Sequence, residues 1–84
     1  MFFVYAVKSK TRNYIYVGLT GDFDRRFLQH NSGRNRTTKA YAPFLVVLVE
    51  SYPTRPEARK REKYLKSGVG KEYLKSLCLI SDDV

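Results

Sequence analysis

The sequence is poor in the residues that build covalent cross-links and clustered metal sites. Its 84 residues include one cysteine, Cys78, one histidine, His30, and no tryptophan. A lone cysteine cannot form an internal disulfide, and it excludes a cysteine-based metal cluster. The N-terminus shows no signal-peptide pattern, so we expect a cytoplasmic protein without disulfide-linked partners.

Long hydrophobic runs are also absent. The apolar runs over residues 2–7 and 44–49 have the length of strands, whereas a membrane-spanning helix needs about 20 residues. We therefore expect no membrane partner. A hydrophobic content of 43% is nevertheless typical of a folded globular protein, and the length predicts a single domain.

Acidic residues are scarce relative to basic ones. The chain has 16 Lys and Arg against 8 Asp and Glu, which gives a net charge of +8. Asp82 and Asp83 fall in a predicted C-terminal tail, residues 81–84, so the predicted domain over residues 1–80 holds a larger positive surplus. A surplus of this size in a small domain favours a polyanionic partner such as nucleic acid, and solubility alone is the other explanation.

Three segments show strand patterns, with alternating polarity or short apolar runs bounded by turn residues: residues 2–7, 14–19 and 44–52. The first is apolar on both faces, which is typical of a central strand. A hairpin folded about residues 10–11 would join the first two strands and bring Tyr5 opposite Tyr16, within one residue of register. We therefore expect two phenols side by side on one face of a sheet.

Helical periodicity and capping signals predict three helices. The first extends from about residue 22 to residue 33, with Thr20 or Asp22 able to cap its N-terminus. The second covers residues 57–67 behind a capping box, and the third covers residues 71–78. The predicted order is β-β-α-β-α-α, which indicates an α/β (α+β) domain with a three-stranded antiparallel sheet flanked by helices.

Several polar side chains fall on faces that the core should bury. Each alone has an ordinary explanation, as a core tyrosine, an edge histidine, a surface cation or an ion-pair partner. A small core holds so much polarity only at a cost in free energy, so together they indicate a functional site. The candidates are Tyr5, Tyr16, Arg26, His30 and Glu62.

Basic residues gather in two other segments. The loop over residues 34–39 contains three cations and two hydroxyls, so it is either a solvated connector or a loop that grips phosphates. The second predicted helix also carries many cations around a thin apolar stripe. The candidate nucleic-acid contacts in these two segments are Arg34, Arg36, Thr37, Thr38, Lys39, Arg59, Lys63 and Lys66.

In order and spacing, these residues resemble the GIY-YIG nuclease family over residues 3–75. The similarity is greatest to the small stand-alone bacterial members, which are related to the GIY-YIG nuclease domain of the bacterial excinuclease ABC. Residues 3–5, Phe-Val-Tyr, stand where the family has Gly-Ile-Tyr. Residues 16–18, Tyr-Val-Gly, match its Tyr-Ile-Gly element. The first motif therefore lacks its glycine.

The resemblance extends to both helix signatures. Arg26, with His30 four residues later, matches the signature of the first helix. Residues 57–66 match that of the second, whose metal-binding glutamate falls on Glu62. Some family members also carry a second histidine after the first helix, or an asparagine after the glutamate helix, and this sequence has neither.

The resemblance implies a divalent-metal-dependent endonuclease that hydrolyses phosphodiester bonds of DNA, branched or damaged, with a role in DNA repair in the bacterial cytoplasm. It implies one Mg²⁺ or Mn²⁺ ion at Glu62. One carboxylate can suffice, because Mg²⁺ keeps several waters and substrate oxygens as ligands. The alternatives are a catalytically inactive nucleic-acid-binding module on the same fold and a structural protein-interaction domain. A protein partner stays open.

The resemblance also implies roles for the remaining candidates. Tyr16 would be the general base toward the attacking water and would relay its proton to His30, while Tyr5 would orient the site. A planar guanidinium suits the non-bridging oxygens of a phosphate in the transition state, and Arg26 is the candidate for that contact.

Overall fold

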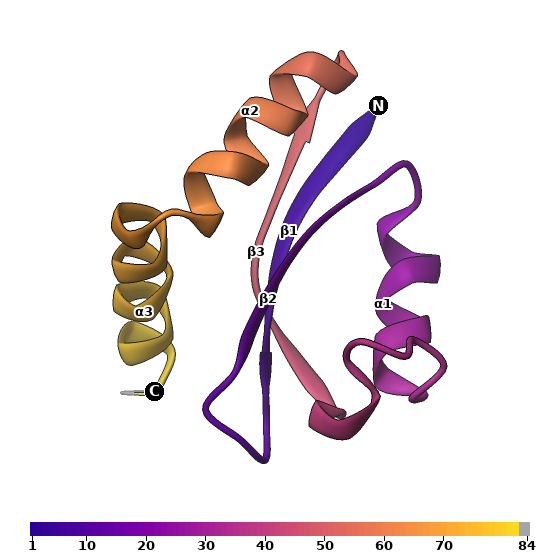
Figure 1. Ribbon diagram of the computed structural model, residues 1–84, viewed down its shortest axis with the longest axis vertical. Coiled ribbons are helices and arrows are strands. Elements are labelled where there is room, and N and C mark those ends of the chain that lie inside the picture. Colours follow the sequence, from indigo (N-terminus) through magenta and orange to yellow (C-terminus); the bar gives the residue numbers. More distant parts are fainter. Residues whose placement is uncertain (83–84) are drawn as a thin grey trace.

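The computed structural model describes residues 1–82, and it describes the surroundings of side chains for residues 1–78. The predicted order β-β-α-β-α-α is confirmed (Figure 1). A single turn of 3-10 helix, η1, is added before the third strand. The elements are β1 (Phe2–Ser9), β2 (Ile15–Thr20), α1 (Phe23–Asn31), η1 (Lys39–Tyr41), β3 (Phe44–Tyr52), α2 (Arg55–Lys66) and α3 (Gly68–Asp82).

The sheet has the strand order β2-β1-β3, and both pairings are antiparallel. The prediction that the first strand is central is therefore confirmed. Apolar side chains on both faces allow β1 to be covered from two sides. β2 and β3 are the edge strands, so the backbone of each has one side that no neighbouring strand occupies.

The predicted register of the hairpin was wrong by two residues. Tyr5 pairs with Gly18, and Tyr16 pairs with Val7. The turn is longer than expected because the buried hydroxyl of Ser9 accepts hydrogen bonds from the backbone N–H groups of Thr11 and Arg12, at 3.2 and 3.0 Å. A two-residue shift keeps the same face, so both phenols still share one side of the sheet, with ring centroids 6.2 Å apart.

Helices cover both faces of the sheet. In Figure 1, α1 lies to the right of the strands, while α2 and α3 lie to the left. Under α2 and α3 a core of buried aliphatic residues forms, made of Val4, Ala6, Val17, Ala58, Leu65 and Leu74. Under α1 the core is largely aromatic, made of Tyr5, Val7 and Phe44 with Phe23 and Phe27 packed against them.

The helix ends follow the capping signals. Of the two candidates, Asp22 is the cap of α1, and its carboxylate accepts from the backbone N–H of Arg25 at 3.2 Å. Thr54 caps α2, as predicted, and accepts from Glu57 N at 3.4 Å. α2 is followed at once by α3, because Ser67 ends the former and its hydroxyl accepts from the N–H of Gly70.

The C-terminal helix is longer than expected. It covers Gly68–Asp82 rather than residues 71–78, so the first two residues of the predicted tail belong to α3. Residues 83–84 of that tail lie outside the described residues. Across the described part of the chain, no helix has the length and apolar character needed to cross a membrane.

Candidate active site

The five predicted catalytic residues come from four elements: Tyr5 on β1, Tyr16 on β2, Arg26 and His30 on α1, and Glu62 on α2. The charges of Arg26 and Glu62 both act on the pKa of Tyr5, which Arg26 lowers and Glu62 raises. Its hydroxyl hydrogen bonds to His30, and its ring lies 6.2 Å from the ring of Tyr16. The fold therefore brings these residues together around Tyr5.

The position of the Tyr5 ring depends on Gly18 in the facing strand. Tyr5 is fully buried and lies directly over this residue. A Cβ atom at position 18 would stand 2.5 Å from Oη and 2.6 Å from Cζ of Tyr5. Because real side chains do not approach so closely, only glycine leaves room for the phenol.

His30 is fully buried, and both of its ring nitrogens have partners. Nε2 lies 2.9 Å from Oη of Tyr5, and Nδ1 lies 2.8 Å from Oγ1 of Thr38. Burial lowers the pKa of His30, and the nearby charge of Arg26 lowers this pKa further. The imidazole is therefore neutral near pH 7, with one nitrogen accepting and the other donating.

The phenol of Tyr5 decides which nitrogen accepts. Burial raises the pKa of Tyr5 to about 12; the charges of Tyr16 and Glu62 also raise this pKa, against the opposing effect of Arg26. Tyr5 therefore keeps its proton, and its O–H donates a hydrogen bond to Nε2 of His30. Nδ1–H of His30 then donates to Thr38.

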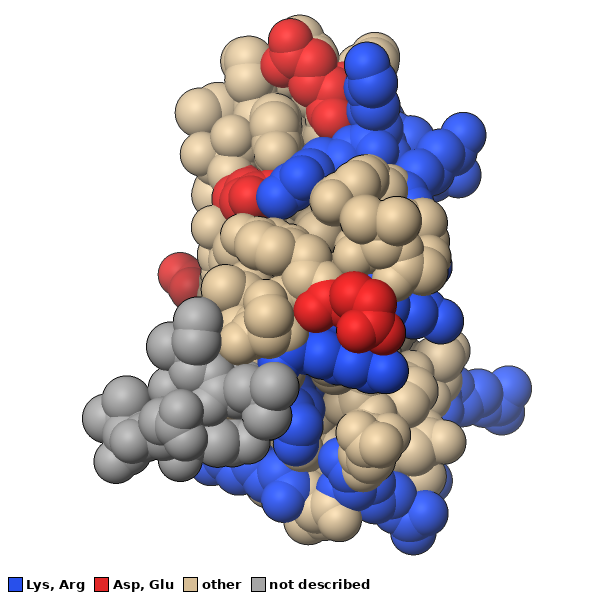
Figure 2. Space-filling view, turned by 90° about the vertical axis from the view of Figure 1, so that its left-hand side faces the viewer, with Lys and Arg blue, Asp and Glu red and all other residues tan. Residues whose placement is uncertain are grey.

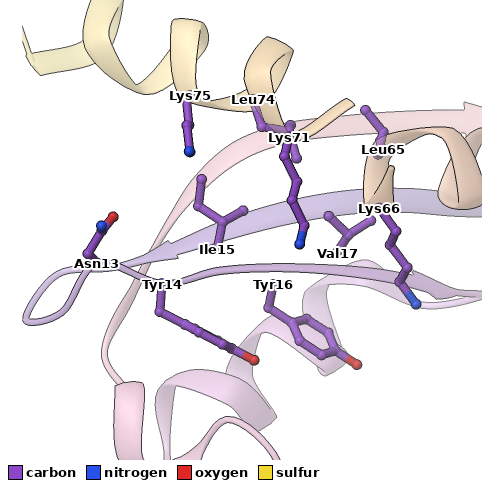
Figure 3. Close-up of a pocket in the computed structure, with 10 residues that line it drawn as sticks. All are labelled: Asn13, Tyr14, Ile15, Tyr16, Val17, Leu65, Lys66, Lys71, Leu74 and Lys75. Carbon is purple, nitrogen blue, oxygen red and sulfur yellow. The ribbon is translucent and has the colours of Figure 1, made fainter. Parts of the chain in front are cut away.

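Tyr16 stands beside this chain of hydrogen bonds. Its half-buried ring packs on the His30 ring with centroids 4.9 Å apart. Figure 3 shows its side chain, with that of Tyr14, pointing away from α2 and α3. Among the described residues, the Tyr16 hydroxyl has no hydrogen-bond partner, so it is available to a substrate or a water. The expected relay leads from Tyr16 to His30, but the direct hydrogen bond of His30 is to Tyr5.

Arg26 reaches the site with unused donors. Its Nε is buried without a hydrogen-bond partner within the described residues, and Nη1 makes a long contact of 3.4 Å to Oε1 of Gln29. The guanidinium also acts on the hydroxyl of Tyr5, whose pKa it lowers. A buried donor without a protein partner is able to bind a water or a substrate oxygen. The cleft of about 400 Å³ beside it is lined by Thr20, Gly21, Asp22, Arg25, Arg26 and Gln29.

Glu62 is the carboxylate of the site, and its side chain is 10% exposed. Oε2 lies 3.2 Å from Nζ of Lys66, and Oε1 lies 3.7 Å from Nη1 of Arg59. Residues 1–78 contain no group of three or more His, Cys, Asp or Glu side chains that could hold a metal ion. One carboxylate fits an ion such as Mg²⁺, which fills most of its coordination shell with water and substrate oxygens.

The predicted nucleic-acid contacts divide into two groups. Seven of the eight are exposed, on the loop after α1 and on α2: Arg34, Arg36, Thr37, Lys39, Arg59, Lys63 and Lys66. Thr38 differs, because it is fully buried and its hydroxyl holds His30. No periodicity relates Thr38 to His30, since the irregular loop between them sets their distance, and sequence reasoning therefore missed this contact.

Comparison with known proteins finds one matching family model and several similar bacterial proteins. The family model described as the GIY-YIG catalytic domain matches residues 1–74. The UPF0213 protein SERP0126 of Staphylococcus epidermidis is 36% identical over 76 residues, which cover 89% of this chain and 92% of that protein. A UPF0213 protein of Nitratidesulfovibrio vulgaris is 32% identical over 84 residues, which cover 99% of this chain and 76% of that protein.

A solved structure is also similar. The solution NMR structure of the UPF0213 protein BH0048 from Bacillus halodurans shares 36% sequence identity with this chain. The match has a TM-score of 0.55 and covers 92% of this chain and 85% of the other. The order of the elements and the sheet thus agree with a fold already seen by experiment.

The close approach of Tyr5 to Gly18 predicts a sharp difference between two glycines. Gly18→Ala should displace the buried phenol and lower the melting temperature, with a loss of about 1–3 kcal/mol typical of overpacking. Gly21→Ala is the matched control, because a Cβ atom there meets nothing within 4 Å. Thermal unfolding of both variants tests this, and equal melting temperatures would contradict the proposed packing.

The buried, neutral His30 predicts a protein that loses stability in mild acid. Below the unfolded pKa of about 6.5, the unfolded chain gains a proton on His30 while the folded chain, whose pKa is lower, does not. The free energy of unfolding should therefore decrease as the pH falls below about 6.5, and His30 should contribute no change above it. Melting curves between about pH 7.5 and 5.5 test this, with His30→Gln as the control that removes the dependence. A wild-type curve as flat as that of the variant would refute it.

Proposed function

Since this chain belongs to the GIY-YIG catalytic-domain family, we propose that it is a divalent-metal-dependent endonuclease that hydrolyses DNA phosphodiester bonds. The family implies a nuclease-type fold and a DNA substrate. The observation that supports catalysis most is that a guanidinium with an unused donor and a lone buried carboxylate both act on Tyr5. These are the guanidinium of Arg26, with a buried and unpartnered Nε, and the single carboxylate of Glu62.

Arg26 supplies the positive charge that phosphodiester hydrolysis needs. The transition state gathers negative charge on the non-bridging oxygens, and a preorganised donor stabilises it most when water is excluded. A guanidinium is planar and presents its N–H donors in a fixed arrangement that matches phosphate oxygens. Since its Nε is already desolvated in the protein, the energetic cost of burial is met before the substrate arrives.

Glu62 is the residue that would hold the metal ion. GIY-YIG nucleases generally use divalent metals, and when bound such an ion neutralises charge on the phosphate. Lys66 and Arg59 now occupy the two carboxylate oxygens at 3.2 and 3.7 Å. Both cations are more than half exposed, so they can turn toward substrate phosphates when the carboxylate takes another ligand.

Tyr16 is the proposed general base toward the attacking water. Its hydroxyl has no partner among the described residues, while that of Tyr5 is held by His30. The Tyr5–His30–Thr38 chain fixes the imidazole against the Tyr16 ring. A proton passing from Tyr16 to His30 would require Nε2 to exchange its bond with Tyr5.

A catalytically inactive DNA-binding module is the second candidate. The observation in its favour is that both oxygens of Glu62 already have cationic partners. Such a module would keep the exposed cations of the loop after α1 and of α2 but would not cleave. A cleavage assay with Mg²⁺ or Mn²⁺ on supercoiled, branched and single-stranded DNA distinguishes the two functions.

The biological setting belongs to the same proposal. The relatives compared above are bacterial, and a bacterial DNA substrate is met in the cytoplasm. Branched or damaged DNA is the substrate class that we propose, with a role in DNA repair.

The metal role of Glu62 gives the first test. Glu62→Gln should abolish metal-dependent cleavage, while DNA binding in the presence of a chelator should stay equal or become tighter, because a negative charge is lost. Glu57→Gln is the control, since it removes the same charge from an exposed position of α2. Full cleavage by Glu62→Gln would rule out the assignment of the metal ligand.

Tyr16 gives the second test. Tyr16→Phe keeps the ring packing and removes only the hydroxyl, so single-turnover cleavage should slow by roughly 10²–10⁴, the usual contribution of a positioned acid–base group. The melting temperature should change little. Tyr14→Phe removes a hydroxyl from the same face of the sheet, and it should cleave normally.

His30 then tests the relay. If Tyr16 and His30 act as one unit, the rate losses of Tyr16→Phe and His30→Ala should be far less than additive in the double variant. A melting curve for each variant separates loss of fold from loss of chemistry. Additive losses would mean that the proton leaves by another route.

A further inference from the structure

A second cleft lies on the side of the sheet that α2 and α3 cover. It has a volume of about 510 Å³ and is formed between β2 and these two helices (Figure 3). The floor of this cleft is apolar, and three lysines surround the floor. We call it the lysine cleft. The half-buried Ile15 lines the floor together with the core residues Val17 and Leu74, and Lys66, Lys71 and Lys75 form the rim.

We propose that the lysine cleft binds a nucleotide of the DNA strand next to the scissile phosphate, with lysines on the phosphates and the base on the apolar floor. The inference rests on the proposed function, which it extends by a second contact surface. It adds Lys71 and Lys75 of α3 to the residues that meet DNA.

The edge strand β2 connects this cleft with the catalytic residues. Ile15 and Val17 point toward α2 and α3, while Tyr14 and Tyr16 point to the other side of the sheet (Figure 3). No strand of the described residues pairs with the outer side of β2. A DNA strand leaving the hydroxyl of Tyr16 therefore has to cross only one strand of the sheet to reach the lysines.

Lys66 joins the two places directly. Its ammonium lies 3.2 Å from the carboxylate of Glu62, and the same side chain lines the lysine cleft. In this arrangement one phosphate of a DNA strand binds near Glu62, and the next phosphate binds in the lysine cleft. This continuity makes the cleft part of one substrate path.

The charge of the cleft favours an anionic ligand. Lys71 and Lys75 are four residues apart on α3, where like charges repel each other. The ion pairs among the described residues do not include Lys71, and that of Lys75 with Glu72 is long, at 3.7 Å, and exposed. Figure 2 views this side of the molecule and shows Lys and Arg gathered toward its right-hand and lower margins.

The combination of floor and rim points to a nucleotide. A free phosphate would use the lysines but leave the apolar floor empty, and an apolar peptide would leave the lysines unpaired. A nucleotide combines an anionic phosphate with a flat base, and the volume of the cleft lies within the usual range for small-molecule sites. Contacts of this kind tolerate any base, as is common for single-strand binding.

Paired substitutions test the proposal. The variant Lys71→Ala with Lys75→Ala removes two rim charges, and alanine favours the helix, so α3 should stay folded. The control variant Arg55→Ala with Lys60→Ala removes the same charge from exposed positions of α2 outside the cleft. Affinity for a fluorescent single-stranded oligothymidylate is measured in a chelator over a range of salt concentrations.

The rim variant should bind more weakly, and its plot of log K against log salt should be shallower by about 1.4 units than that of the unaltered chain, since each phosphate contact on a single strand contributes about 0.7. The control pair should change this slope much less. Equal slopes for the two pairs would overturn the proposal.

NMR provides a second measurement on the same samples. Oligothymidylate should shift the methyl signals of Ile15, Val17 and Leu74, and the rim variant should lose these shifts. Shifts confined to the catalytic side of β2 would also overturn the proposal. An acidic peptide that produced the same methyl shifts more strongly than the oligonucleotide would reassign the cleft to a protein partner.

Cleavage assays keep this inference separate from the proposed function. If the unaltered chain cleaves DNA and the two pairs of variants bind alike, the proposed endonuclease activity is supported and nucleotide binding in the lysine cleft is refuted. If the unaltered chain never cleaves but the slopes differ as expected, the cleft stands and the catalytic assignment does not. An unaltered chain that binds no DNA refutes both.

Discussion

The packing of Tyr5 over Gly18 is the contact on which the candidate active site of this protein depends. The ring of Tyr5 is fully buried, and no side chain larger than hydrogen fits beneath it. From that position its hydroxyl holds His30, which in turn reaches Thr38 in the loop after α1. One buried phenol thus connects β1, β2, α1 and the loop, while the hydroxyl of Tyr16 has no hydrogen-bond partner among the described residues.

The two faces of the sheet have different surroundings. Under α1, aromatic rings surround a neutral imidazole, and burial keeps both Tyr5 and His30 uncharged near pH 7. Under α2 and α3, an aliphatic core supports helices whose outer surfaces carry cations. The edge strand β2 takes part in both, because its successive side chains point to opposite faces. Glu62 and Lys66 are on adjacent turns of α2 and form an ion pair. The charge of Glu62 raises the pKa of Tyr5, which lies in the core under α1.

Much of the arrangement was predictable because local signals were strong. Strand order, helix caps and the order of elements follow from periodicity, Thr54 and the turn at Gly21-Asp22. The hairpin register could not be predicted in this way, because it depends on the Ser9 hydroxyl, which accepts hydrogen bonds from the backbone of its own turn. The start of α3 was missed for a similar reason, as Ser67 serves both helices at once.

The sequence by itself determined the fold class, the family and the four candidate residues that gather around Tyr5, because hydrophobic period and motif spacing are local properties of the chain. Only the tertiary structure decided what each polar group contacts. It buried Thr38 and directed its hydroxyl to His30, it gave His30 to Tyr5 as a hydrogen-bond partner, and it left Nε of Arg26 without one among the described residues. These outcomes depend on how closely segments far apart in the chain approach each other, to within a few tenths of an ångström, and residue spacing does not encode this.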